Sequence, residues 1–269
     1  MKERRRISIH PLVVPTVFFF LWMGQLKFFL WMLLFVTIHE VCHCIVAFCF
    51  GAKMRRITLT PLGEQAEIKG MEGLSYWKRQ SILLAGPLAS FLLGFLLGIG
   101  FGKEELAWMN YLVGGFNMLP FMPMDGGGIA LNFFGKRNGT LRTMNILKKV
   151  SAGFGYFLIL VGCIQVLLYP YHISLLLIGS YFVSVNKKGY LTYTYYIYKE
   201  LLHPHKKIMP IRKILLEKNT TLGETVLRMN IDYYFLFFNE REGELHTKSQ
   251  LEIMQQLLQE GVSGKVWGE

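Results

Sequence analysis

Long apolar runs separated by short polar loops fill the first part of the chain. These runs lie at residues 12–25, 27–50, 81–102, 106–119, 150–168 and 173–185. A helix that crosses a bilayer needs about 20 mostly apolar residues, and the short first run predicts a span that is tilted little or locally broken. The pattern therefore predicts an α-helical multi-pass membrane protein with about six transmembrane helices.

A different pattern interrupts the spans at residues 54–69, where apolar and polar positions alternate around Pro61 and Gly63. Alternation with a period of two, broken by turn-forming residues, indicates a β-hairpin. A small sheet at the membrane edge could accept an extended peptide as an added strand. A solvated loop is the plainer interpretation of the same residues.

The composition changes after Lys188. We assign residues 1–188 to a membrane domain, 189–208 to a linker and 209–269 to a small α/β domain. The linker begins with a tyrosine-rich tract of the kind that settles in the lipid headgroup zone, because tyrosine is amphipathic.

The last domain shows both helix and strand signals. Thr221-Leu-Gly-Glu224 has the capping-box pattern that opens a helix. An aromatic strand is predicted at 233–238, followed by a turn at 239–243. Leu251 and Met254 begin a run with helical spacing.

The charge of the chain supports a membrane protein. Hydrophobic residues make up 52% of the sequence, and the formal net charge is +11. The basic residues gather at the N-terminus and in alternate loops, where they record membrane orientation, so we predict cytoplasmic termini and no direct nucleic-acid partner. The segment Met1–Arg6 resembles the start of a signal peptide, but no small-residue cleavage site follows it, which indicates a retained signal-anchor.

The second apolar run contains Ile38-His39-Glu40-Val41-Cys42-His43, which has the pattern His-Glu-x-x-His. On a helix, the two histidines lie on one face and can share one Zn²⁺, and the glutamate can take a proton from water. Ionisable side chains inside a membrane are costly and mark functional sites. We interpret Cys42 and Cys44, which flank His43, as small apolar residues.

A second polar group lies at residues 117–127, with the sequence Asn-Met-Leu-Pro-Phe-Met-Pro-Met-Asp-Gly-Gly. Pro123 and Gly126 predict that the helix breaks beside Asp125, leaving backbone polar groups that only a protein-lined cavity tolerates. A lone aspartate at membrane depth is costly unless it is paired with a cation. The plainer alternative is that Asp125 caps a helix ahead of the glycines.

The simplest arrangement combines these two segments into one zinc site. His39, His43 and Asp125 would hold one Zn²⁺ per chain, and the fourth position would be left for water. Glu40 would be the general base for attack on a peptide carbonyl. Asn117 would hold the substrate or stabilise the oxyanion, unless it only makes a hydrogen bond between helices.

Three stretches together resemble the signatures of the site-2-type intramembrane zinc metalloproteases, peptidase family M50. They are Ile38–His43, Leu84-Ala-Gly-Pro87 and Asn117–Gly127. The short six-span layout and the trailing cytoplasmic unit are most similar to the sporulation branch of the family. The resemblance implies a zinc endopeptidase that activates a membrane-associated precursor, a pro-sigma factor.

The resemblance also implies a location and partners. The sporulation branch acts in the mother-cell membrane around the forespore, with the active site facing the cytoplasm and surrounded by membrane lipid. Its proteases are held in check by inhibitory membrane partners.

For the C-terminal unit the resemblance implies a cystathionine-β-synthase-type (CBS) regulatory domain that senses an adenine nucleotide such as ATP. Such domains place Thr-x-x-Asp where the closing strand meets the helix. Thr247-Lys-Ser-Gln250 keeps the threonine, our candidate nucleotide contact, but lacks the acid. A docking role without nucleotide is the alternative, and a unit of under about 60 residues is expected to form a homo-oligomer or to rest on a partner.

Other functions fit parts of the pattern. A metal transporter also needs intramembrane His and Asp, but transporters usually show internal repeats and several polar sites along a path, which this sequence does not. A catalytically dead scaffold is disfavoured because all the expected zinc and base residues are present. A site-2 protease that cleaves an anti-sigma factor or a lipid-pathway substrate is a further alternative, although those relatives usually carry a PDZ domain, for which this chain has no room.

Overall fold

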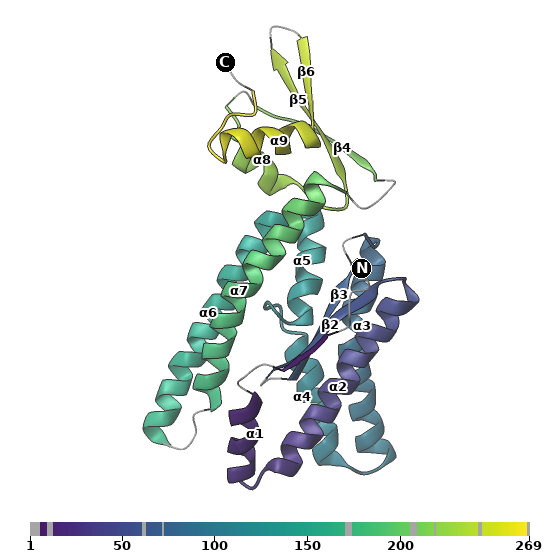
Figure 1. Ribbon diagram of the computed structural model, residues 1–269, viewed down its shortest axis with the longest axis vertical. Helices are drawn as coiled ribbons and strands as arrows, with labels where there is room; N and C mark the ends of the chain where they lie inside the picture. The colour runs from purple at the N-terminus through teal and green to yellow at the C-terminus, as the bar shows by residue number, and fades with distance from the viewer. Residues whose placement is uncertain are drawn as a thin grey trace. The chain divides into compact units, whose positions relative to one another are not determined.

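The computed structural model of the chain describes its helices and strands over most of its length (Figure 1). The described residues are 6–9, 13–60, 63–71, 73–169, 174–204, 209–217, 219–241 and 244–267. They divide into two compact units, and each is described by itself. The first unit comprises residues 1–120 and 124–129, and the second comprises 121–123 and 130–269.

Helices make up most of the first unit. They are α1 (Val13–Trp22), α2 (Leu26–Cys49), α3 (Tyr76–Phe95), which continues into a π-helical turn at Leu96–Gly100, α4 (Glu104–Asn117) and the first residues of α5 (Asp125–Asn138). α3 packs against α2 and against α4. The buried side of α2 includes Phe35, His39, His43 and Ala47, spaced by four residues. The histidine motif therefore lies on the buried stripe of its helix.

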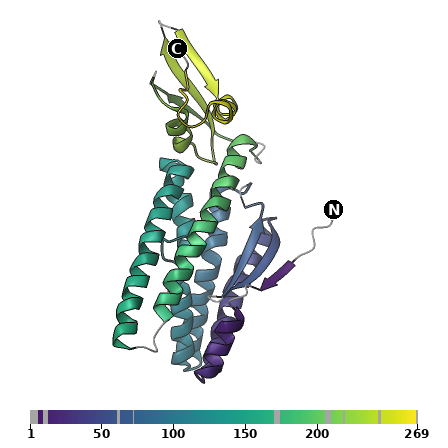
Figure 2. The same cartoon turned by 60° about the vertical axis from the view of Figure 1, so that its left-hand side comes forward.

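A three-stranded sheet lies beside α2 in the first unit (Figure 2). β2 (Lys53–Thr60) and β3 (Gly63–Lys69) pair antiparallel, which confirms the predicted hairpin, while its turn at residues 61–62 lies outside the described residues. β1 (Arg6–Ile9) adds to β2 in parallel. This strand was not predicted, because four residues give too short a pattern to identify as a strand.

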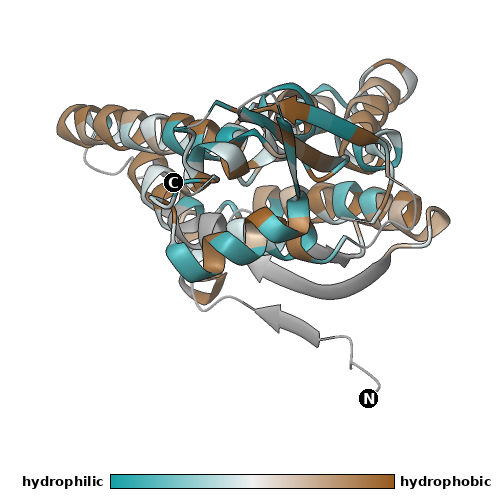
Figure 3. Ribbon diagram, turned by 90° about the horizontal axis from the view of Figure 1, so that it is seen from above, coloured by the Kyte–Doolittle hydropathy of each residue, from teal (hydrophilic) through white to brown (hydrophobic). Residues whose placement is uncertain are grey.

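Three helices of the described chain are long and apolar enough to cross a membrane. They are Leu26–Cys49, Tyr76–Gly100 and Thr140–Leu168. Figure 3 shows brown, hydrophobic residues along several of the helices. α1 and α4 have only 10 and 14 residues, so their predicted spans do not reach this length. The six-span layout therefore stays a prediction.

Two long helices pack together in the second unit. α6 (Thr140–Leu168) and α7 (Ser174–Leu202) pack along each other. A Cβ added at Gly155 would lie 2.7 Å from Val183 Cγ2, so a small residue is needed for this close approach. Both helices extend beyond their apolar runs, and α7 continues to Leu202 through much of the stretch predicted to be a linker. An apolar run marks only the hydrophobic part of a helix, not its full length.

The C-terminal part of the second unit is a small α/β fold. Its elements are β4 (Ile211–Leu215), α8 (Leu222–Arg228), β5 (Tyr234–Arg241), β6 (Glu244–Ser249) and α9 (Gln250–Glu260). The sheet has the order β4-β5-β6, with β4 parallel and β6 antiparallel to β5. β5 continues to Arg241, so residues 239–241 of the predicted turn belong to the strand, and residues 242–243 lie outside the described residues. The strand predicted at 233–238 is present as β5, and the helix predicted around Leu251 and Met254 is present as α9.

Both helices of this fold begin with a capping box, and the one at Thr221 was predicted from sequence. At α9, the backbone N–H and the hydroxyl of Ser249 donate to the Glu252 carboxylate. These hydrogen bonds hold the pKa of Glu252 below its usual value. A charged Glu252 at the first turn also suits the positive end of the helix dipole.

The small fold rests on the ends of α6 and α7, and its apolar core is continuous with theirs. The buried Gln250 links the parts, because its Nε2 donates to the Leu201 carbonyl (2.8 Å) and its Oε1 accepts from the Phe235 N–H (3.2 Å). At the start of α6, the Thr140 N–H donates to the Met229 carbonyl (2.9 Å), and the Asn230 amide donates to the Thr140 hydroxyl (3.0 Å). The chain's own helices therefore supply the support that so small a fold needs.

Replacing Gly139 by alanine is expected to loosen this junction. Gly139 has φ +91°, and an added Cβ would overlap the Leu227 carbonyl. Backbone strain of this kind costs on the order of 1–3 kcal/mol. We expect a lower melting temperature and faster proteolytic release of the C-terminal fold. Gly153→Ala is the control, because a Cβ there meets nothing within 4 Å, and equal proteolysis of the two variants would contradict the expectation.

Candidate metal centre

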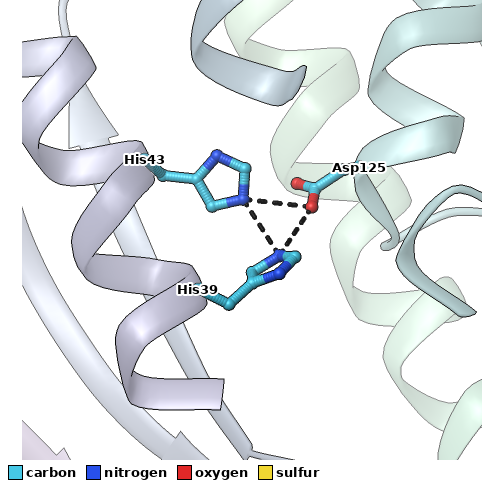
Figure 4. A group of neighbouring side chains, drawn as sticks. All are labelled: His39, His43 and Asp125. Atoms are coloured by element: carbon cyan, nitrogen blue, oxygen red, sulfur yellow. Dashed lines mark hydrogen bonds and ion pairs between the residues drawn. The ribbon is translucent and has the colours of Figure 1, made fainter. Parts of the chain in front are cut away.

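Three side chains from two helices of the first unit meet at one point (Figure 4). Both imidazole rings extend from α2 toward the carboxylate of Asp125, which is the first residue of α5. Asp125 Oδ2 lies 3.0 Å from His39 Nε2 and 3.0 Å from His43 Nε2, and the two nitrogens are 3.1 Å apart. The two histidines are almost fully buried. The structure therefore brings together three atoms that are metal ligands in many proteins.

The outer nitrogens of both rings have hydrogen-bond partners on α3. His43 Nδ1 lies 2.6 Å from the Ile82 carbonyl oxygen, and His39 Nδ1 lies 2.9 Å from the Ser90 hydroxyl. A carbonyl can only accept, so Nδ1 of His43 carries a proton. In the neutral ring, Nε2 of His43 then presents a lone pair.

The group fits a zinc ion. A lone pair on Nε2 that faces a carboxylate oxygen is repulsive unless a cation lies between them. Four ligands at about 2.0–2.1 Å around a tetrahedral ion lie about 3.3 Å from one another. The separations of 3.0–3.1 Å among His39, His43 and Asp125 are close to that value. His39, His43 and Asp125 can therefore hold a metal ion.

Glu40 lies between the two histidines on α2 and is partly buried. It directly follows His39 in the sequence, so its carboxyl belongs to the helix that supplies both histidines. Its role as the general base stays a prediction.

The helix break predicted before Asp125 is present. α4 ends at Asn117 and α5 begins at Asp125, and Pro123 lies in the connection between them. A Cβ added at Gly126 would overlap the Met118 carbonyl, so the first turn of α5 needs a glycine to lie against the end of α4. The side-chain amide of Asn117 donates to the Val113 carbonyl of its own helix (3.0 Å). In this conformation the Asn117 amide is bonded within α4.

The candidate nucleotide contact in the tail has different surroundings. Thr247 lies in β6 and is exposed. Gln250, which occupies the position of the acid in a nucleotide-binding motif, is the buried side chain that joins α9 to Leu201 and Phe235. Its amide is therefore used in holding the fold together.

Three residues of α3 lie around the site, and the sequence assigned a role to none of them, although Gly86 belongs to the stretch Leu84–Pro87 noted above. The three residues are Ile82, Gly86 and Ser90. Their spacing of four residues, with Gly86-Pro87 in the middle, was the available signal. The roles of the Ser90 hydroxyl and the Ile82 carbonyl depend on the histidines that they contact, so the spacing alone could not assign these roles.

Comparison with known proteins gives consistent similarities. Residues 27–104 match the sequence profile of Peptidase family M50. "Zinc metalloprotease MJ0392" of Methanocaldococcus jannaschii is 32% identical over 149 residues, which cover 51% of this chain and 43% of that protein. "Stage IV sporulation protein FB" of Bacillus subtilis is 28% identical over 177 residues, covering 63% of this chain and 60% of that protein. The chain thus spans about half the length of these relatives.

A solved structure shares the fold. The "Site-2 Protease from Methanocaldococcus jannaschii" superposes with a TM-score of 0.59 at 24% sequence identity. The match covers 68% of this chain and 89% of that structure. At this level of identity the similarity establishes the arrangement of the helices.

Proposed function

We propose that this chain is a zinc-dependent endopeptidase of the site-2 type that cleaves a protein substrate within or at the edge of a membrane. The match of residues 27–104 to the profile of Peptidase family M50 supports this proposal. The observation that carries the proposal is the meeting of His39, His43 and Asp125. α2, which supplies both histidines, is one of the helices apolar enough to cross a membrane. Three ionisable groups inside such a helix bundle point to chemistry rather than to packing.

In the proposed mechanism each residue has one role. His39, His43 and Asp125 hold the ion, which when bound would act as a Lewis acid on the scissile carbonyl. Glu40 accepts the proton of the attacking water and then passes it to the leaving amine nitrogen. Asn117 contacts the substrate or the developing oxyanion after its amide has left the Val113 carbonyl. Gly126 and the helix break at Pro123 position the first turn of α5, which carries Asp125.

We assign the substrate to the class of membrane-associated precursors, with a sporulation sigma-factor precursor as the first candidate. The similarity to stage IV sporulation protein FB of Bacillus subtilis supports this choice. An anti-sigma factor is the alternative substrate. The substrate would lie as an added strand along β3, an edge strand of the β1-β2-β3 sheet, because β3 packs beside the helix that carries the histidines.

The topology in this proposal has six spans and cytoplasmic termini. The shorter helices α1 and α4 would cross with the three long ones and α7, and the motif would face the cytoplasm. The basic residues of the loops support this orientation. In a sporulating cell the location would be the mother-cell membrane around the forespore, with inhibitory partners in the same membrane.

The C-terminal fold would regulate the protease as a CBS-like docking unit. Its order of strand, helix, two strands and helix supports the assignment. Gln250 stands where the nucleotide-binding motif has an acid, and its buried amide makes hydrogen bonds to Leu201 and Phe235. We therefore favour a protein partner or a second copy of the chain, rather than ATP, as the ligand of this fold.

The test uses the full chain purified in detergent. We expect about one zinc ion per chain by mass spectrometry, and cleavage of a pro-sigma factor that stops with a chelator and returns with added zinc. A protein that binds no zinc would refute the proposal. So would zinc-loaded protein that carries zinc across vesicle membranes but cleaves no member of a panel of membrane-associated precursors.

A further inference from the structure

One face of α3 lies against the two histidines of α2. Ile82, Gly86 and Ser90 are spaced by four residues, so they share a face of the helix. All three belong to the buried residues of α3, and α3 packs directly on α2. These residues therefore meet the histidine motif along its length.

The two ends of this face hold the two rings. At one end, the Ile82 carbonyl accepts a hydrogen bond from His43 Nδ1 (2.6 Å). At the other end, the Ser90 hydroxyl lies 2.9 Å from His39 Nδ1, and Ser90 is 2% exposed. When the hydroxyl accepts, both rings carry their proton on Nδ1 and direct a lone pair on Nε2 toward Asp125.

The middle of the face leaves space. A Cβ added at Gly86 would lie 2.5 Å from His39 Nε2 and closer still to His43 Nε2. Zinc binds histidine nitrogen at about 2.0–2.1 Å. A methyl group at residue 86 would therefore compete with an ion for the same volume.

We propose that Ile82, Gly86 and Ser90 form a template on α3, which fixes the tautomers of His39 and His43 and keeps the ion's place open. The inference rests on the proposed function, since it assigns these residues to the same metal site. Ser90 is a positioning residue, because it acts through His39. Gly86 acts by the absence of a side chain.

The first test replaces the Ser90 hydroxyl. Removing the partner of a ligand histidine typically lowers metal affinity by about 10–100-fold. We expect Ser90→Ala to weaken zinc binding by that factor, measured by competition with a chromophoric chelator. The visible absorption of the Co²⁺-loaded protein should also change, because the ring is free to rotate. Ser81→Ala on the same helix is the matched control, because Ser81 is exposed.

The second test fills the space at residue 86. Gly86→Ala is expected to lower the zinc content from about one ion per chain to near zero. Gly153→Ala, the same change where a Cβ meets nothing within 4 Å, should keep its zinc. Gel filtration and circular dichroism without metal report whether Gly86→Ala is folded. If it is not folded, the zinc affinity of Ser90→Ala alone tests the role of α3 at the metal site.

The outcomes separate this inference from the proposed function. If the wild type binds zinc and Ser90→Ala matches it in affinity and in Co²⁺ spectrum, the role of Ser90 is wrong. If folded Gly86→Ala binds zinc as the wild type does, the role of Gly86 is wrong. If both variants lose zinc affinity while the wild type cleaves nothing, the role of α3 is supported and the proposed proteolysis is wrong. A wild type without zinc overturns both.

Discussion

Glu40→Gln is expected to abolish cleavage while zinc remains bound. Glutamine keeps the size of the side chain and its place on α2, but it cannot accept a proton from water. General acid–base groups contribute about 10²–10⁴-fold to enzymatic rates. We expect a loss of at least about that size in the processing of a pro-sigma factor, measured with purified protein, and an unchanged zinc content.

A matched control exists on α4. Glu105→Gln makes the same change at an exposed position and should cleave at the wild-type rate. If Glu40→Gln processes the substrate normally, Glu40 is not the general base. If it also loses its zinc, the carboxylate has a role in binding the ion that the proposed ligand set lacks.

Asp125→Asn is expected to remove both zinc and cleavage. The Asp125 carboxylate lies 3.0 Å from each Nε2, and it supplies the anionic ligand of the group. An asparagine amide can instead donate a hydrogen bond to an Nε2 lone pair, which satisfies the site without an ion. We therefore expect a folded protein with zinc affinity reduced by at least about 10²-fold, beyond the 10–100-fold typical of outer-shell changes.

Zinc content and a chelator competition measure this loss. Asp232→Asn, in the C-terminal fold, is the control for the same change at a distant position in the sequence. Retention of one tightly bound zinc by Asp125→Asn would mean that Asp125 is not a ligand. Asp125 would then be better explained as a residue that caps the start of α5.

Local patterns allowed several features to be predicted from the sequence. The spacing of His39 and His43 places both on one face of any helix, whatever surrounds it. The prolines and glycines near Asp125 predicted the break between α4 and α5. Alternation predicted the hairpin of β2 and β3. Each of these depends only on residues close together in the chain.

Other features depend on residues far apart and could not be predicted in this way. The separation of His39 and Asp125 depends on how α2 and α5 pack, and the two residues are 86 positions apart in the sequence. Ser90 looks like any small polar residue of an apolar helix until His39 is seen beside it. The same is true of Gln250, whose part in holding the C-terminal fold requires Leu201.

The sequence by itself therefore determined the kind of chemistry: two histidines and a glutamate on one apolar helix, and an aspartate at a helix break. Only the tertiary structure decided that the aspartate reaches the histidines, and that α3 holds their outer nitrogens while Gly86 leaves room between them. The physical reason is that side-chain chemistry and helical period are local properties. The position of one helix face against another follows from the packing of the whole unit.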